Sequence, residues 1–97
     1  MSEKKYFTKN PKIFNEKIDD VGIILFDEER KETHLLNQSA MLIWDLIEEK
    51  TAVCDIYDLY CKSISFDGIS HDEVRKDFYE IIDLLEQKNI ICELKNE

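Results

Sequence analysis

The spacing of apolar residues in this chain changes at Asn37. Before it, apolar residues form short runs typical of strands, whereas after it they recur at intervals of three and four, as on one face of a helix. A run of strands followed by a run of helices predicts an α+β fold. The 97 residues are enough for one compact domain and leave little room for a second.

Two or three antiparallel strands, a β-meander, are predicted before Asn37. Residues 12–18 are weakly extended, and residues 21–26 form a β-branched and aromatic run whose continuous apolarity implies cover on both faces. Residues 32–36 return as a partner strand. Between the last two strands, the mixed charges of residues 27–32 favour an exposed hairpin turn over an interaction site.

Three helices are predicted after the strands. Asn37 is a favourable N-cap for a helix over residues 38–49, and Thr51 is a candidate cap for a second helix. The clearest helix start is the capping box formed by Ser70 and Glu73. Apolar residues recur at helical spacing at Ala40, Ile43, Trp44 and Ile47 in the first helix and at Val53, Ile56, Leu59, Tyr60 and Ile64 in the second.

The third helix is expected to span residues 71–88 and to end at Asn89, which can adopt a left-handed cap conformation. At about 100° per residue, Ile82 and Tyr79 lie outside the core stripe of this helix. They form either a wide apolar face against the sheet or the wall of a groove. The core stripe consists of Val74, Phe78, Ile81 and Leu85, with Ile90 and Ile91 packed beneath the helix end.

The chain is acidic, with 22 acidic against 13 basic residues and a net charge of -9. This charge repels phosphate backbones and anionic membranes, so neither nucleic acid nor a membrane is an expected partner. No apolar run is long enough to span a bilayer, and no signal peptide opens the chain, so we expect a cytoplasmic protein. Residues 1–10 are polar and lysine-rich, and we expect a flexible segment ahead of a domain over residues 11–94.

Signatures of enzymes and metal sites are absent from the sequence. The two glycines are 46 residues apart and form no phosphate-binding loop, and there is no nucleophile elbow or paired CxxC motif. The histidines, His34 and His71, show no catalytic spacing with a cysteine. The three cysteines, Cys54, Cys61 and Cys92, are expected to be free thiols. We therefore expect a protein that is not an enzyme and has no cofactor or metal.

The ordered features resemble the PqqD-like family. The most specific part of the resemblance is the stretch LN-x-[ST]-A-x-x-I-W, which begins at Leu36 and ends at Trp44. The resemblance extends over about residues 11–94. Two positions depart from the family pattern: Asn89 stands where a glycine is common, and residues 48–52 lack the usual glycine. Asparagine can adopt the same left-handed conformation as glycine.

The resemblance implies a winged-helix-like fold with a three-stranded antiparallel β-meander followed by three helices, and no catalysis. It also implies that the protein binds the leader of a ribosomally synthesised precursor peptide and presents it to a separate modifying enzyme. That enzyme would be a radical SAM enzyme or a leader peptidase with a cyclase. The leader would join the sheet as an extra strand beside the third strand and enter the cleft against the third helix.

The residues expected to bind the leader come from two elements. The edge of the third strand would be formed by Thr33, His34, Leu35 and Leu36. The opposite wall, on the third helix, would be formed by Arg75, Tyr79, Ile82 and Glu86. In this prediction, apolar leader residues pack on Tyr79 and Ile82, and a leader carboxylate meets Arg75.

Two alternative functions stay open at this stage. A winged-helix DNA-binding regulator would have a similar content of strands and helices, but it requires a basic recognition helix, whereas the third helix is mostly acidic. A structural or dimerisation module without a peptide ligand is the other alternative. Formation of a homodimer is compatible with any of these functions.

Overall fold

The computed structural model describes residues 5–19, 22–64, 68 and 70–94, apart from the side chains of residues 17–19. The strands are β1 (Tyr6–Lys9), β2 (Ile13–Asp19), β3 (Gly22–Asp27), β4 (Glu32–Asn37), β5 (Thr51–Ala52) and β6 (Ile91–Leu94). The helices are α1 (Gln38–Leu46), α2 (Val53–Ser63) and α3 (His71–Gln87). None of the described helices is long and apolar enough to cross a bilayer.

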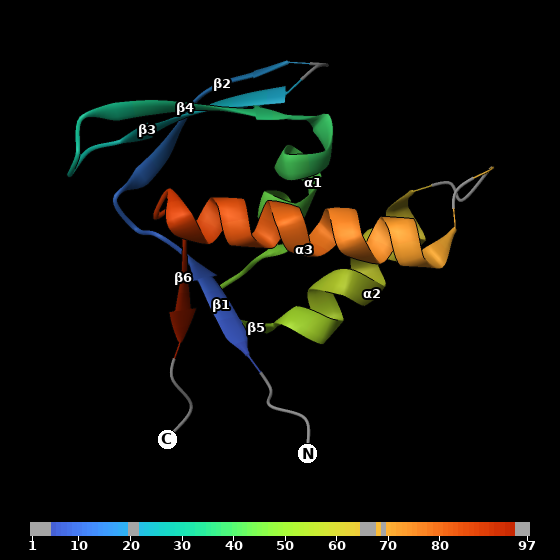
Figure 1. Cartoon of the computed structure of the whole chain (residues 1–97). Coiled ribbons are helices and arrows are strands. Elements are labelled where there is room, and N and C mark those ends of the chain that lie inside the picture. Colours follow the sequence, from blue (N-terminus) through green and yellow to red (C-terminus); the bar gives the residue numbers. More distant parts are fainter. Residues whose placement is uncertain (1–4, 20–21, 65–67, 69, 95–97) are drawn as a thin grey trace.

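The strands form two three-stranded sheets. One sheet, with the order β2-β3-β4, is called the meander here, and the other, with the order β5-β1-β6, is called the terminal sheet. In the view of Figure 1, the meander lies on one side of α3 and the terminal sheet on the other. The predicted antiparallel meander followed by three helices is confirmed.

One hydrophobic core joins both sheets and all three helices. The meander contributes alternate residues, because successive side chains of a strand point to opposite faces. The terminal sheet contributes Phe7 and Ile91, and Ile90 packs beneath α3 as predicted. Fully buried core residues include Leu25 of β3, Ile43 of α1, Ile56 of α2, and Phe78 and Leu85 of α3.

The meander is covered on one face only. On the inner face, Ile23 and Leu25 are fully buried, whereas Leu35 on the outer face is 75% exposed. Ile24 lies opposite Leu35, and Phe26 lies opposite Phe14, so the outer apolar residues shield one another across the strands. The prediction that β3 is covered on both faces is therefore wrong. The apolar residues on the outer face of β3 are covered by side chains of the neighbouring strands and not by a second layer of structure.

The N-terminal segment contains a strand. Tyr6–Lys9 forms β1, which pairs antiparallel with β5 and β6, and Phe7 is buried. The prediction of a flexible segment over residues 1–10 is wrong for this part, whereas residues 1–4 lie outside the described residues. The strand is stabilised by pairing with the other end of the chain, which a local sequence pattern does not reveal.

Asn10 joins the end of β1 to the end of α3. Its backbone N–H donates to the Ile90 carbonyl at 3.0 Å, and its side-chain amide donates to the Asn89 carbonyl at 2.7 Å. Its side-chain oxygen accepts from the Lys12 N–H at 2.9 Å. Because Asn10 is buried, these bonds satisfy polar groups that would otherwise be costly to bury.

The predicted helix starts at Asn37 and Ser70 are confirmed. The Asn37 side chain accepts from the Ala40 N–H at 2.9 Å, and the Ser70 hydroxyl accepts from the Glu73 N–H at 3.2 Å. The prediction that Thr51 caps the second helix is wrong, because its hydroxyl accepts from the Glu48 N–H and the residue lies in β5. The backbone of Ile47 is already extended, so α1 ends at Leu46 instead of continuing to residue 49.

The C-terminus of α3 has the predicted left-handed cap. Asn89 has φ 60°, the Ile90 N–H donates to the Leu85 carbonyl, and the Asn89 N–H donates to the Glu86 carbonyl. This pair of bonds is the Schellman motif, which satisfies the last carbonyls of a helix and turns the chain sharply. It directs Ile91 straight into β6.

The hairpin turn between β3 and β4 is capped by Asp27, which is fully buried. Its carboxylate accepts from the Glu29 and Arg30 N–H groups at 2.9 and 3.0 Å and pairs with the Arg30 guanidinium at 3.3 Å. The predicted turn over residues 27–32 is therefore confirmed, with Lys31 in the left-handed region at φ 57°.

We expect the conformation of Asn89 to control the stability of the α3–β6 junction. Asn89→Val should lower the free energy of unfolding by about 1–2 kcal/mol, because a β-branched side chain disfavours positive φ. Asn89→Gly should leave it equal or raise it. Urea denaturation followed by circular dichroism measures both variants, and an equal loss in both would show that the asparagine side chain, not the backbone, is what matters.

We also expect Asp27 to make stability dependent on acid pH. The backbone N–H of Arg30, aided by the Arg30 guanidinium and the Glu29 N–H and opposed by burial, holds the pKa of Asp27 below its ordinary value of 3.8. The resulting stabilisation is present above the unfolded-state pKa and is lost as the pH falls through the folded-state pKa. Between about pH 4 and pH 2, the free energy of unfolding should therefore fall less steeply in Asp27→Asn than in the wild type. Glu28→Gln, an exposed neighbour, is the control, and identical slopes in Asp27→Asn and the wild type would contradict this assignment.

Candidate functional site

The strand β4 forms one edge of the meander. It pairs with β3 along its length, and no described strand pairs with its other side. In an antiparallel pair, every second residue directs its backbone N–H and C=O away from the partner strand. The free edge of β4 therefore offers backbone donors and acceptors to a further extended chain.

A cavity of about 290 Å³ lies between the end of β4, the start of α1, and α3. Four residues of α3 line it, spaced so that they share one face of the helix, and we call them the groove flank. Together with the free edge of β4, they form what we call the β4–α3 groove. The groove flank consists of Asp77, Glu80, Ile81 and Leu84, and the other lining residues are Asn37, Ser39 and Tyr60.

The groove flank combines apolar and acidic side chains. Ile81 is half-buried and Leu84 is 44% exposed, so both offer apolar surface that the core does not use. Asp77 and Glu80 are exposed, and neither has an ion pair or side-chain hydrogen bond with another described residue. This surface suits a ligand that brings apolar groups and compensates negative charge.

The four residues predicted on β4 differ in what they expose. The side chains of Thr33 and Leu35 point to the outer face of the meander, where both are exposed. His34 is half-buried on the inner face, and Leu36 is a buried core residue. What the four share is the backbone of the free edge, which the structure leaves unpaired among the described strands, while the Leu36 side chain belongs to the core.

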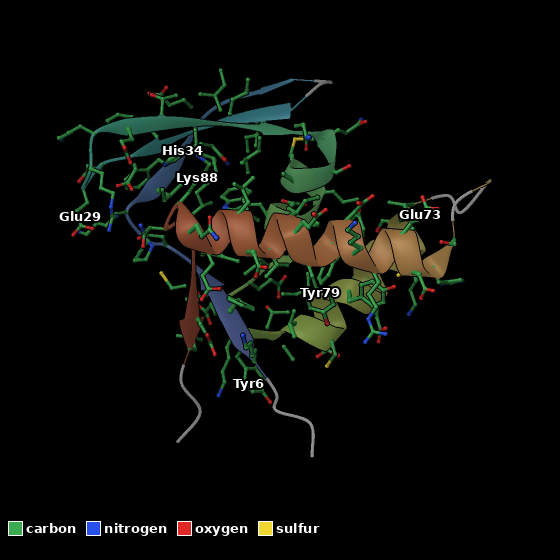
Figure 2. The ribbon with its side chains drawn as sticks, viewed as in Figure 1. Tyr6, Glu29, His34, Glu73, Tyr79 and Lys88 are labelled. Carbon is green, nitrogen blue, oxygen red and sulfur yellow. The ribbon has the colours of Figure 1, made fainter. Side chains whose placement is uncertain are left out.

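The predicted wall on α3 lies on a different flank from the cavity. Ile82 is only 3% exposed and packs in the core. Tyr79 stacks on Tyr57 of α2, with ring centroids 6.4 Å apart, and Figure 2 shows it on the side of α3 toward α2. Arg75 and Glu86 share that flank by helical spacing, and none of these four residues lines the cavity.

Two adjacent isoleucines of α3 are buried differently from the prediction. The predicted stripe puts Ile81 in the core and Ile82 in the groove, whereas the structure buries Ile82 and leaves Ile81 beside the cavity. Either residue fits a stripe with Val74 and Phe78 by spacing alone. Leu84, an apolar residue outside the predicted stripe, is the sequence signal for the groove flank.

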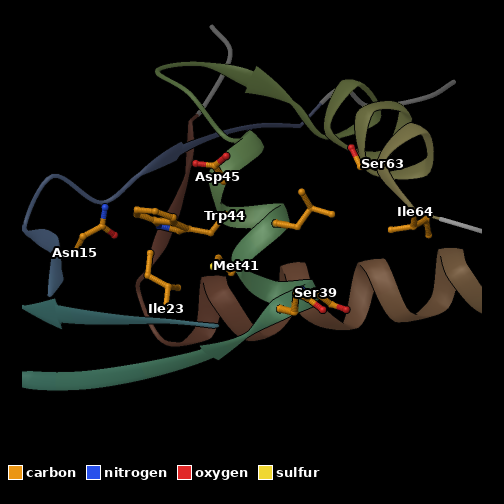
Figure 3. A pocket seen from close by; sticks show the side chains of 10 residues that line it. Asn15, Ile23, Ser39, Met41, Trp44, Asp45, Ser63 and Ile64 are labelled. Atoms are coloured by element: carbon orange, nitrogen blue, oxygen red, sulfur yellow. The ribbon is translucent and has the colours of Figure 1, made fainter. Parts of the chain in front are cut away.

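A larger cavity, of about 650 Å³, lies at α1 between the meander and the end of α2, and Figure 3 shows its lining. Trp44 lines it and is otherwise buried, which confirms its predicted role in the core. Its Nε1–H has no partner among the described residues, and the Lys9 ammonium lies 4.1 Å from its ring centroid. No residue of the groove flank contributes to this cavity.

One set of side chains in the described part of the chain has the composition of a metal site. Oxygen atoms of Asp27 and Glu32 and a ring nitrogen of His34 lie within 4.8 Å of one another. The Asp27 carboxylate already accepts two backbone hydrogen bonds and pairs with Arg30. The turn therefore accounts for the position of the Asp27 carboxylate. Cys54, Cys61 and Cys92 are free thiols, as predicted.

Comparison with known proteins agrees with this geometry. The model of the family described as coenzyme PQQ synthesis protein D (PqqD) matches residues 22–91, which include β3, β4 and the three helices. Among solved structures, TbiB1 in complex with the TbiA(β) leader peptide is similar in fold, with a TM-score of 0.70 and 16% sequence identity over 92% of this chain and 99% of that chain. None of the curated proteins matches the chain significantly. On the strength of the family match, this chain belongs to the PqqD family.

Proposed function

We propose that this chain is a non-catalytic protein that captures the leader of a ribosomally synthesised precursor peptide. The observation that carries this proposal is the free edge of β4 beside the groove flank of α3. Membership of the PqqD family supports it. A protein of similar fold, TbiB1, was solved with a leader peptide, which supports it further.

The leader binds as an additional strand of the meander. Its backbone pairs with the outward-directed N–H and C=O groups of β4, which gives affinity with little demand on sequence. Every second side chain of the added strand then points to the inner face, towards Ile81 and Leu84. The backbone therefore supplies the common part of the binding energy, and the groove flank supplies the selection among peptides.

Chemistry on the precursor is left to a separate enzyme. The bound leader holds the following core segment near the domain, which raises the local concentration of that segment for an enzyme docked on the same protein. The partner enzyme is of the class that modifies such precursors, either a radical SAM enzyme or a leader peptidase acting with a cyclase. The protein itself works in the cytoplasm, where precursors are synthesised.

A charge on the groove flank should abolish leader binding without unfolding the domain. Leu84→Glu places a carboxylate where an apolar leader side chain packs, so we expect at least a tenfold loss of affinity. The ligands are synthetic N-terminal segments of candidate short precursor peptides from the genome that encodes this chain, and affinity is measured by isothermal titration calorimetry.

The matched control is Leu59→Glu. Leu59 is 43% exposed on α2, against 44% for Leu84, and does not line the cavity. The same substitution there should leave affinity unchanged, and circular dichroism should show both variants folded. An equal loss of affinity in both variants, or none in Leu84→Glu, would contradict the proposed groove.

A further inference from the structure

The Asp77 and Glu80 carboxylates are separated by one helical turn and line the same cavity. Neither has an ion pair or side-chain hydrogen bond with another described residue. Like charges at this spacing repel each other, and the side chains of Ile81 and Leu84 beside them offer no compensating charge. A cation in the cavity would relieve this repulsion.

No basic residue of the chain supplies that cation among the residues that line the cavity. Arg75 lies on the opposite face of α3 by helical spacing. Lys76 is four residues before Glu80, but it forms no ion pair with Glu80 and does not line the cavity. Lys88 lies beyond the C-terminal end of α3, and Figure 2 shows it at the far end of the helix from Glu73. The lining of the cavity near Asn37 is therefore acidic, with no positive charge among the described lining residues.

We propose that Asp77 and Glu80 form a subsite for a lysine or arginine side chain of the leader, an inference that rests on the proposed function. On a strand added to β4, the residue level with Leu36 points to the inner face, and we place the basic side chain there, at the end of the cavity lined by Asn37. Its aliphatic stem packs on Ile81 and Leu84, and its charged head lies between the two acids at the solvent-exposed rim.

The same geometry fixes the character of a second leader residue. Inward-pointing side chains of a strand are two residues apart, so the next one towards the middle of β4 lies further along α3. There the groove flank offers Leu84, whose exposed surface is apolar. The leader is therefore expected to carry a basic residue and an apolar residue separated by one position, and an acidic residue at the first of these positions is excluded by repulsion.

A displayed library of random 15-residue peptides tests this inference and does not require the natural precursor to be identified. Peptides are selected separately on the wild type, on Asp77→Lys and on Glu93→Lys, and the enriched sequences are compared. Glu93 is exposed on β6 in the terminal sheet, so the control has the same change in net charge at a site outside the cavity. Selection on Leu84→Glu gives the background for peptides that bind outside the groove.

The wild type and Glu93→Lys should enrich peptides with lysine or arginine two residues from an apolar residue, and Asp77→Lys should lose or reverse the charge preference. In an enriched peptide, replacing the basic residue by glutamate should weaken binding to the wild type by about tenfold. Enrichment without a basic preference, or a preference unchanged in Asp77→Lys, would overturn the subsite and leave strand addition standing. No enrichment above the Leu84→Glu background would overturn both the subsite and the proposed function.

Discussion

The position of α3 between two sheets is the constraint on which the proposed site depends. The buried residues of α3 pack in a core shared with the meander and the terminal sheet. The C-terminal end of α3 is fixed by the left-handed Asn89 and by hydrogen bonds from Asn10. A helix held in this way presents its groove flank at a fixed position relative to the edge of β4. A peptide then meets a site whose rigid elements are already in place, which lowers the entropic cost of binding.

The proposed function needs little more from so short a chain than a strand edge and a helix flank. Strand addition needs only an unpaired edge, and a 97-residue domain with two small sheets has several. What distinguishes β4 from β2, the other edge of the same sheet, is that its neighbouring cavity is lined by α3, whereas the larger cavity, lined by Asn15 of β2, contains no residue of α3. In the proposed site, the backbone edge gives affinity for any extended chain, and the groove flank of α3 makes the binding selective.

Local sequence signals predict what local interactions determine. The caps at Asn37 and Ser70, the left-handed Asn89 and the turn at Asp27 all depend on hydrogen bonds within a few residues, and all are predictable. The strand β1 escapes such prediction because it pairs with β6 at the opposite end of the chain. The expectation that the site lies on β4 comes from the family resemblance, since an unpaired edge has no signature in one sequence.

Hydrophobic periodicity alone does not decide which apolar residues of α3 belong to the groove flank. Adjacent apolar residues at 81 and 82 both fit a core stripe, and the choice between them depends on tertiary packing. The stacking of Tyr79 on Tyr57 turns that flank of α3 toward α2, so the opposite flank borders the cavity near β4.

The most direct measurement of strand addition is amide hydrogen exchange by NMR, with and without a bound leader peptide. Alternate amides of β4, either Thr33 and Leu35 or His34 and Leu36, should exchange more slowly in the complex, while the outer edge of β2 is unchanged. Slower exchange confined to β2, or unchanged exchange along β4 in a saturated complex, would contradict binding at this edge.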